Sequence, residues 1–587
     1  MRSKIFFICL STVLSFYFIG CSSDSSGVEE DAEGIDGTAR IISATTFNEA
    51  ASSEDISYEY TEGGDTHEEN NDYVIDESAI IEITLNGNSI SASDASVTIS
   101  GTKAVITAAG TYRITGTLED GQILVDADAE DTIKILFNGI DISNATNSPF
   151  AIMSAAKTVI QVVEGTENRL TDAGTYIFED DDDEPDAALF SKDDLTIFGG
   201  GELIVTGNYN EGIKSKDGLI LKETTITVSS VDDGIQGKDY LIVYSGNVTV
   251  DSAGDGLKSN NDEDADLGYI QIDEGTFIIT AEADAIQAET AVMINGGDLT
   301  LTSGGGSTSV ISDDDSANGV KAGSTIIINN DAVVTVNAAD DAVHSNASIA
   351  INGGTFILAS GDDAIHADGI LDIFNGDITI TESVEGIEGA YITISGGKIV
   401  LNSSDDGING AGDETGSVYT LDITGGNIYV NASGDGIDVN GSITMSGGAV
   451  IVDGPVNRNN GALDYDRSFT LTGGYLLAVG SSGMMQTPGN DSTQPVLAVR
   501  FDQNIDAGTI LHLESTEGTD IFTYAPAKTI QSIVFSSPDF TTGDAYNLIL
   551  GGSGDGTIEN GLYLDGNYTP GTLYHTFTTS SNLTSIY

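Results

Sequence analysis

The chain has 587 residues, and its 92 acidic side chains stand against 20 lysines and arginines, which gives a formal net charge of −72. Such a surface repels phosphate, so nucleic acid is excluded as a partner. The charge also destabilises a compact state by self-repulsion, which bound divalent cations would relieve because each one takes several carboxylate oxygens. A hydrophobic content of 39% together with 71 glycines indicates a folded, turn-rich chain.

Residues 1–20 are predicted to be a lipoprotein signal peptide. A basic start is followed by an apolar run that is too short for a comfortable membrane span. The run ends in Phe18-Ile19-Gly20-Cys21, which resembles a bacterial lipobox with phenylalanine in place of the usual leucine. We therefore expect export and lipidation at Cys21, with anchoring in the bacterial envelope, at the outer membrane and exposed on the surface. An ordinary signal peptide is the alternative. The chain's other cysteine lies within the signal, so the mature chain is expected to have no disulfide.

Two segments precede the main repeat. Residues 21–77 combine many acids with serine and glycine and show little periodicity, which predicts an acidic flexible tether. Residues 78–185 contain short alternating runs such as Ile81-Glu82-Ile83-Thr84-Leu85, which predict an N-terminal β region that leads into the repeat.

Residues 186–480 contain the repeat that decides the predicted fold. Each unit reads Asp-Asp-Gly/Ala-Ile-x-small, then an alternating strand, Gly-Gly and a second alternating strand, as in the unit that begins at Asp362. The step between units is most often close to 22 residues, which fits one coil of a parallel β-helix with three short strands. Stacked coils bury the apolar face that a single coil leaves open, and parallel crossovers are right-handed. No Leu-x-x-Leu-x-Leu frame recurs, which argues against a leucine-rich repeat.

The predicted fold class is therefore all-β, a right-handed parallel β-helix (solenoid) with an N-terminal β region and a C-terminal β cap. Residues 481–587 are assigned to the cap because they lack the repeat but alternate as short strands. A solenoid needs such a cap to cover the open edge of its last coil.

One acid of each unit recurs at the same place and is expected to form a vertical row on the stacked coils. Two unit charges about 4.8 Å apart repel by about 1 kcal/mol in water. A turn aspartate that bonds its own backbone explains one acid per turn, but it does not explain pairs such as Asp362-Asp363. Paired carboxylates on neighbouring coils offer the oxygens that Ca²⁺ prefers. The predicted calcium ligands are Asp232, Asp233, Asp255, Asp340, Asp341, Asp362, Asp363, Asp405, Asp406, Asp435 and Asp438.

A second row follows three residues after each acid and is expected to face outward. Its members are Lys214, Gln236, Lys258, Gln287, Lys321, His344, His366, Glu388, Asn409 and Asp438. Such a mixed row is typical of a solvated or ligand-facing stripe, and Lys214, Lys258, His344 and His366 are the candidate glycan contacts. His344 and His366 could alternatively clamp zinc, although the other members of the row argue against a soft metal.

Several further motifs carry a resemblance to a known family. They include Gly110-Thr111-Tyr112-Arg113-Ile114 near the start, Gly434-Asp435-Gly436-Ile437-Asp438 in the coils, and Gly461-Ala462-Leu463-Asp464-Tyr465-Asp466 after them. In this order they resemble the bacterial carbohydrate-binding domain-containing proteins with a pectate-lyase-like right-handed β-helix. The resemblance implies calcium in the turns and binding of plant-type polysaccharides such as cellulose and polygalacturonate. Glu211, Asn318 and Glu385 depart from the pattern at three coils.

We therefore expect a monomeric, calcium-dependent and non-catalytic polysaccharide binder at the cell surface, held to the membrane only through its lipid anchor. Two alternatives stay open. A lyase of the pectate-lyase type would need a base beside the calcium cluster, for which Lys258 next to Asp255 is the candidate. A structural adhesin would use the same scaffold without binding sugar, because fold alone does not decide function.

Overall fold

The computed structural model describes residues 39–40, 66–178, 183–312, 315–412, 418–579 and 581–587, and this part of the chain is all-β. A single 3₁₀ turn, η1 (Glu77–Ala79), interrupts the strands. Within these residues no helix is long and apolar enough to cross a membrane. The predicted signal peptide and Cys21 lie outside the described residues.

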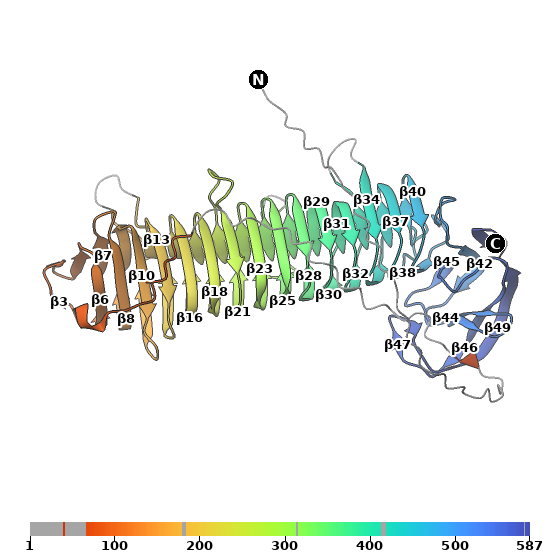
Figure 1. Ribbon diagram of the computed structural model, residues 1–587, viewed down its shortest axis with the longest axis horizontal. Coiled ribbons are helices and arrows are strands. Elements are labelled where there is room, and N and C mark those ends of the chain that lie inside the picture. Colours follow the sequence, from red (N-terminus) through yellow and green to blue (C-terminus); the bar gives the residue numbers. More distant parts are fainter. Residues whose placement is uncertain (1–38, 41–65, 179–182, 313–314, 413–417, 580) are drawn as a thin grey trace, which may run out of the picture. The chain divides into compact units, whose positions relative to one another are not determined.

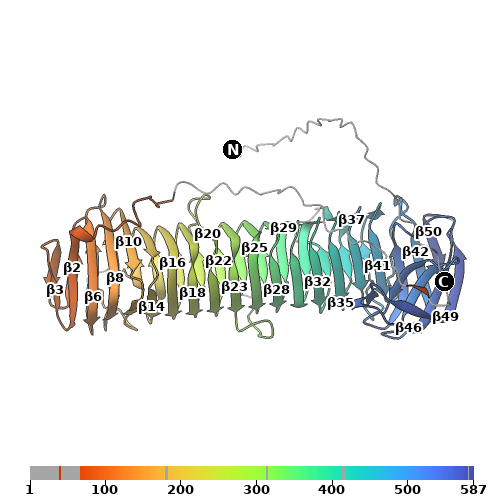
Figure 2. The same ribbon diagram turned by 60° about the horizontal axis from the view of Figure 1, so that its bottom comes forward.

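Strands pair in parallel with the strand one coil earlier and the strand one coil later (Figure 1). Ile365 pairs with Ile387, and Ile387 pairs with Ile408, which are the steps that the sequence repeat predicts. Each coil contributes to three such ladders, and the coils follow one another in chain order (Figure 2).

The first ladder carries the repeated acids at its entry. It consists of β5 (Lys103–Ile106), β7 (Gln122–Asp126), β9 (Phe150–Ser154), β12 (Ala187–Ser191), β15 (Glu211–Ser215), β17 (Ile235–Gly237), β19 (Leu257–Ser259), β22 (Ile286–Ala288), β24 (Val320–Ala322), β26 (Val343–Ser345), the first parts of β29 (Ile365–Ile373) and β31 (Ile387–Ile394), β33 (Ile408–Gly410), β36 (Ile437–Val439) and β39 (Asp464–Tyr465).

The second ladder consists of β10 (Lys157–Val162), β13 (Asp194–Phe198), β20 (Tyr269–Ile272), β27 (Ser348–Ile351), β34 (Tyr419–Ile423), β37 (Gly441–Met445) and β40 (Ser468–Leu471), with the ends of β29 and β31. The third consists of β11 (Glu167–Thr171), β14 (Glu202–Gly207), β21 (Thr276–Ala281), β28 (Thr355–Ser360), β30 (Asp377–Glu382), β32 (Lys398–Ser403), β35 (Asn427–Ala432), β38 (Ala449–Asp453) and β41 (Tyr475–Gly480). Long strands run through both of these ladders: β2 (Ile80–Gly87), β6 (Gly110–Leu118), β8 (Thr132–Ser143), β16 (Gly218–Ser230), β18 (Tyr240–Ser252), β23 (Ala291–Ser303) and β25 (Thr325–Ala338).

Period-2 alternation builds the core between the ladders. Ile365, Leu371, Ile373, Ile378 and Ile380 are all fully buried, as the sequence predicts for the unit that begins at Asp362. Isoleucine and leucine from successive coils stack into one continuous apolar cluster that runs through the coils. Burial of this kind contributes about 25 cal/mol per Å² of apolar surface, and one coil gains it only through its neighbours.

The N-terminal β region is already part of the ladders, since β2 pairs with β6 in parallel. Two antiparallel pairings shape its start, between β2 and β3 (Ile90–Ala92) and between β4 (Val97–Ser100) and β5.

The segment predicted as a tether ends earlier than residue 77, because residues 66–77 lie against the coils. A ring nitrogen of His67 lies 2.7 Å from the Tyr240 hydroxyl, and the Lys157 ammonium donates to Asp72 at 2.9 Å. The acidic composition indicated disorder, but these few polar anchors hold the segment in place.

Antiparallel strands end the coil stack. β45 (Ile530–Ser536) pairs antiparallel with β41 and with β42 (Val496–Ile505), and β42 also pairs with β50 (Leu583–Ile586). A separate sheet contains β1 (Ala39–Arg40), β43 (Leu511–Ser515), β44 (Asp520–Tyr524), β46 (Ala545–Gly554), β47 (Ile558–Glu559), β48 (Leu562–Tyr563) and β49 (Asn567–Thr578).

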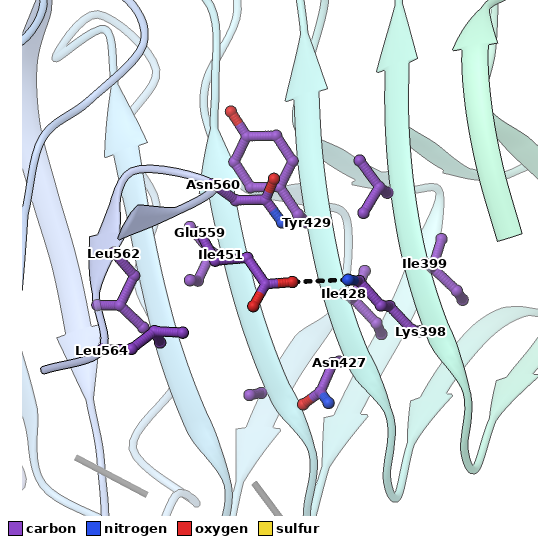
Figure 3. Close-up of a pocket in the computed structure, with 12 residues that line it drawn as sticks. Lys398, Ile399, Asn427, Ile428, Tyr429, Ile451, Glu559, Asn560, Leu562 and Leu564 are labelled. Carbon is purple, nitrogen blue, oxygen red and sulfur yellow. Dashed lines mark hydrogen bonds and ion pairs between the residues drawn. The ribbon is translucent and has the colours of Figure 1, made fainter. Parts of the chain in front are cut away.

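A cavity of about 240 Å³ marks the place where the cap meets the coils (Figure 3). Its walls are largely apolar, and Lys398 of β32 pairs with Glu559 of β47 across it at 2.6 Å. Nearby, the buried Asp453 carboxylate accepts hydrogen bonds from the hydroxyls of Tyr429 and Tyr524, each at 2.8 Å. We attribute this region to docking of the cap, because this ion pair and the Tyr524–Asp453 hydrogen bond join the cap to the coils.

Candidate functional site

The repeated acid has a hydrogen-bonding role that the sequence does not reveal. One oxygen of Asp233 accepts the backbone N–H of Asp255, one coil on, at 2.8 Å. Asp341 accepts from the N–H of Asp363 in the same way, also at 2.8 Å. The pattern continues along most of the row, with the Asn318 side chain accepting from the N–H of Asp341 at 3.1 Å. Each of these aspartates therefore ties its coil to the next with one oxygen and has the second oxygen available for a cation, whereas Asn318 has only the one oxygen.

The predicted stacking of the second row is confirmed by the strand register, which pairs each member with the next one along the row. Lys214 pairs with Gln236, Lys258 with Gln287, His344 with His366, and Asn409 with Asp438. The row continues to Asp464, which pairs with Asp438. Its side chains lie beside the second oxygens of the acid row. The character of the row changes along the stack, from lysine through histidine to acid.

In the early coils, lysines of the row supply the cation. The Lys258 ammonium lies 2.9 Å from Asp233 and 2.8 Å from Asp255, and Lys214 bridges Asp186 and Glu211 at 2.7 Å each. Burial lowers the pKa of Lys258, but the two carboxylates outweigh burial and raise the pKa well above its usual range. The predicted ligands Asp233 and Asp255 thus already pair with an ammonium group of the chain, whose charge also acts on Asp232.

In the middle coils, histidines take the place of lysine. His344 Nδ1 lies 2.7 Å and His366 Nδ1 lies 3.3 Å from the same oxygen of Asp341. Burial raises the pKa of Asp341, but the two imidazoles outweigh burial and lower the pKa to about 2. Burial lowers the pKa of His366, but Asp341 and the neighbouring acids outweigh burial and raise it.

The doubled acids of these coils converge as the sequence predicts. Oxygens of Asp340, Asp341 and Asp362 lie within 4.8 Å of one another, and so do oxygens of Asp362, Asp363 and Glu385. Burial, followed by the charge of Asp341 and the Glu385 carboxylate, raises the pKa of Asp363 to about 11. His366 Nδ1 also lies 3.5 Å from an oxygen of Asp363, so the histidines bring positive charge to this cluster only when they are protonated.

In the last coils, the row itself is acidic. Burial raises the pKa of Asp435 to about 7 and that of Asp438 to about 6, and Asp406 and Asp464 add repulsion in both cases. Among the described residues, no lysine or arginine is paired with these acids. This cluster has the strongest need for an external cation.

The last cluster offers the donor chemistry that a calcium ion prefers. Asp405, Asp406, Asp435 and Asp438 offer oxygen only, which is what Ca²⁺ prefers. Gly434 leaves space for these carboxylates, because a Cβ at this position would clash with a carboxylate oxygen of Asp405 and one of Asp406. Gly254 leaves the same space beside Asp232 and Asp233. The glycine that precedes the acid is therefore part of the candidate site.

A pocket of about 690 Å³ opens beside the histidines. Tyr391 and Ile370 are 43% and 40% exposed and give it an apolar patch, and the polar side chains of Asn346, Asp368 and Glu388 surround this patch. His366 lines this pocket and also lies 3.3 Å from Asp341 of the acid row. The pocket joins a flat aromatic surface to several hydrogen-bonding groups, a combination that small-molecule sites share.

Lys258 borders a second pocket, of about 670 Å³, which it shares with Asp284, Glu289 and Lys321. Most polar groups of this pocket are already paired, since Lys258 bonds Asp255 and the Lys321 ammonium donates to Ser316 at 2.7 Å. Of the four candidate glycan contacts, His366 and Lys258 each line a pocket, whereas Lys214 and His344 pair with acids of the coils.

A family model, a relative and a solved structure match parts of this chain. A family model described as "Carbohydrate-binding domain-containing protein" matches residues 100–364 and 362–473. A protein with the same description from Acetivibrio thermocellus is 46% identical over 210 residues, which is 36% of this chain and 73% of that protein. A solved structure, a polysaccharide lyase-like protein from C. thermocellum as a gadolinium derivative, is 34% identical with a TM-score of 0.40, and the match covers 42% of this chain and 96% of that one.

Proposed function

Because the chain belongs to the carbohydrate-binding domain-containing protein family, we propose that it binds polysaccharide without cleaving it, on coils held together by calcium. In this proposal the coil stack is a right-handed parallel β-helix, and the chain is exported, lipid-anchored and exposed on the cell surface. Cellulose and polygalacturonate are the proposed ligands. The pocket at Tyr391 is the observation that carries the proposal.

The pocket's surface suits a sugar ring. The exposed Tyr391 ring offers a flat apolar face for the ring carbons, and the carboxylates of Asp368 and Glu388 accept hydrogen bonds from hydroxyl groups. The two pocket acids would repel a uronate, so a uronate chain requires a cation between its carboxylates and the protein. The adjoining acid row is the natural place for such a cation. A neutral glucan needs no bridging ion.

Calcium has two roles in this proposal. Ions among Asp340, Asp341 and Asp362 and in the last coils replace repulsion by shared coordination, which stabilises the stack. An ion near the pocket with an open position would also bind a uronate carboxylate. Lysines fill the corresponding place in the early coils, so fewer calcium ions are expected than the number of predicted aspartates suggests.

The pairing of Lys258 supports a binder over a lyase. A lysine base acts by losing a proton near neutral pH, and enzymes achieve this by lowering its pKa. The two carboxylates beside Lys258 raise its pKa and keep the ammonium charged. Its neighbours thus oppose the role of base.

The test is a retention assay of the full chain on cellulose and on polygalacturonate in calcium. We expect Tyr391→Ala to weaken retention by about two- to twelvefold, because a stacked aromatic ring contributes about 0.5–1.5 kcal/mol. Tyr587→Ala is the matched control, since this tyrosine is 76% exposed and lies in the cap. Equal loss in both variants, or no loss in Tyr391→Ala, would contradict the proposed position of the site.

A further inference from the structure

We propose that the cap holds a transition-metal ion of the Zn²⁺ class between His512, Glu514 and Asp520, separate from the calcium-binding coils. These residues lie outside the part of the chain that the family model matches. His512 and Glu514 are two residues apart on β43, so they lie on the same face of the strand. Asp520 begins β44 and pairs with Glu514 after a bulge between Leu513 and Glu514. The hairpin therefore brings the three side chains to one point.

The spacing of the donor atoms suits a tetrahedral ion. His512 Nε2 lies 3.3 Å from Asp520 Oδ1 and 3.6 Å from Glu514 Oε2. Ligands about 2.1 Å from a tetrahedral zinc ion lie about 3.4 Å from one another. The three groups offer one donor atom each, and all three atoms lie within 4.8 Å. A fourth position would fall to water or another donor.

The cluster is buried and its polar atoms lack partners. The side chains of His512 and Asp520 are 0% and 1% exposed, and neither His512 Nε2 nor either carboxylate oxygen of Asp520 has a hydrogen-bond partner. A buried polar group without a hydrogen-bond partner destabilises the fold, and a charged group does so more strongly. A metal ion between them would supply the missing partner to all three residues at once.

A protonated His512 would resolve only part of this problem. One imidazolium N–H can donate to one carboxylate oxygen, which leaves the second oxygen of Asp520 buried without a hydrogen-bond partner. It also leaves two carboxylates against one positive charge. Glu514 already uses its other oxygen to accept from the Asn547 amide at 3.2 Å.

The surroundings of His512 hold the ring as a metal ligand is usually held. Its Nδ1 lies 2.7 Å from the Thr523 hydroxyl, and its ring stacks on Tyr568 at 4.0 Å between centroids. A proton on Nδ1 that is donated to Thr523 leaves the Nε2 lone pair free for a metal. Imidazole with carboxylates suits zinc and related ions, whereas Ca²⁺ takes oxygen ligands.

The test measures zinc and cobalt binding to the full chain in excess calcium. All variants carry His344→Gln and His366→Gln, which remove the histidines of the coils. In this background we expect one tightly bound Zn²⁺ per chain and, with Co²⁺, the intense visible absorption of tetrahedral coordination. Adding Asp520→Asn keeps the shape and is expected to weaken binding more than about 100-fold, beyond the effect of losing an outer partner.

Glu514→Gln is the second variant, because Glu514 lies at the rim and its side chain is 16% exposed. If Asp520→Asn fails to fold, the zinc affinity of Glu514→Gln tests the proposal instead, and we expect it to be weaker than that of the parent. His575→Gln, in the same sheet but outside the cluster, is the matched control and should leave binding unchanged. Absence of a stoichiometric Zn²⁺ ion in the parent, or equal affinity in the parent and the ligand variants, would overturn the proposal.

Discussion

Replacing Asp435 by asparagine should change stability in opposite directions with and without calcium. Asparagine keeps the shape and still offers an oxygen to the Gly461 N–H that Asp435 binds. It removes one charge from a cluster in which Asp406, Asp438 and Asp464 are close enough to repel it. Without calcium at pH 8 the substitution therefore relieves repulsion and stabilises the last coils. With calcium it removes a ligand and destabilises them.

The size of the effect follows from the pKa of Asp435, which rises from an ordinary 3.8 to about 7. Three pKa units correspond to about 4 kcal/mol in favour of the neutral form. Asp435 is only about half-buried, and solvent screening reduces this figure to about 2 kcal/mol. At pH 4 the carboxyl group is largely neutral, so the variant and the native chain should be nearly equal.

Hydrogen exchange of peptides from β33 and β36 measures the local opening free energy in these coils. Asp435→Asn should slow exchange in chelator at pH 8 and speed it in calcium. Asp298→Asn, at an exposed position of β23, is the control and should do neither. Faster exchange of Asp435→Asn under both conditions would refute the reasoning, because the aspartate would then act only as a hydrogen-bond acceptor.

Three more outcomes are expected. As the pH rises from 4 to 7, the free energy of unfolding of the calcium-free protein, measured by urea titration, should fall. The pKa of Asp217 and that of Asp438 are raised to about 6, so the folded state binds more protons than the unfolded state in this range. A rise in the free energy of unfolding with pH would contradict this. Gly434→Ala should lower calcium affinity at least tenfold by calorimetry, whereas the exposed Ser433→Ala should not. Asp453→Ala should cost about 2–4 kcal/mol by leaving the buried Tyr524 hydroxyl and the half-buried Tyr429 hydroxyl without their acceptor, and equal melting of variant and native chain would exclude that role.

The coil register was predictable because two periods coincide in the sequence. The unit repeat of about 22 residues fixes which side chains stack, and period-2 alternation fixes which face inward. For this reason the row from Lys214 to Asp438 follows the predicted order through every pairing. The convergence of Asp340, Asp341 and Asp362 followed from the same register.

Contacts between residues without a repeat were not predictable in this way. The backbone bonds of the acid row depend on side-chain rotamers, and the lysine pairs depend on which oxygen remains free. His67 lies in a segment of disordered composition, yet it reaches Tyr240 across the coils. His512-x-Glu514 and Asp520 form a strand–turn–strand pattern, so pairing this hairpin from the sequence could have revealed the cluster.

The most direct test of the central claim is retention of the full chain on polygalacturonate, first in calcium and then in chelator, with unsaturated products followed in the same sample. The account predicts retention in calcium, release in chelator and no product. Formation of product would make the protein a lyase. Equal retention in calcium and chelator would contradict the calcium-dependent binding on which the account rests.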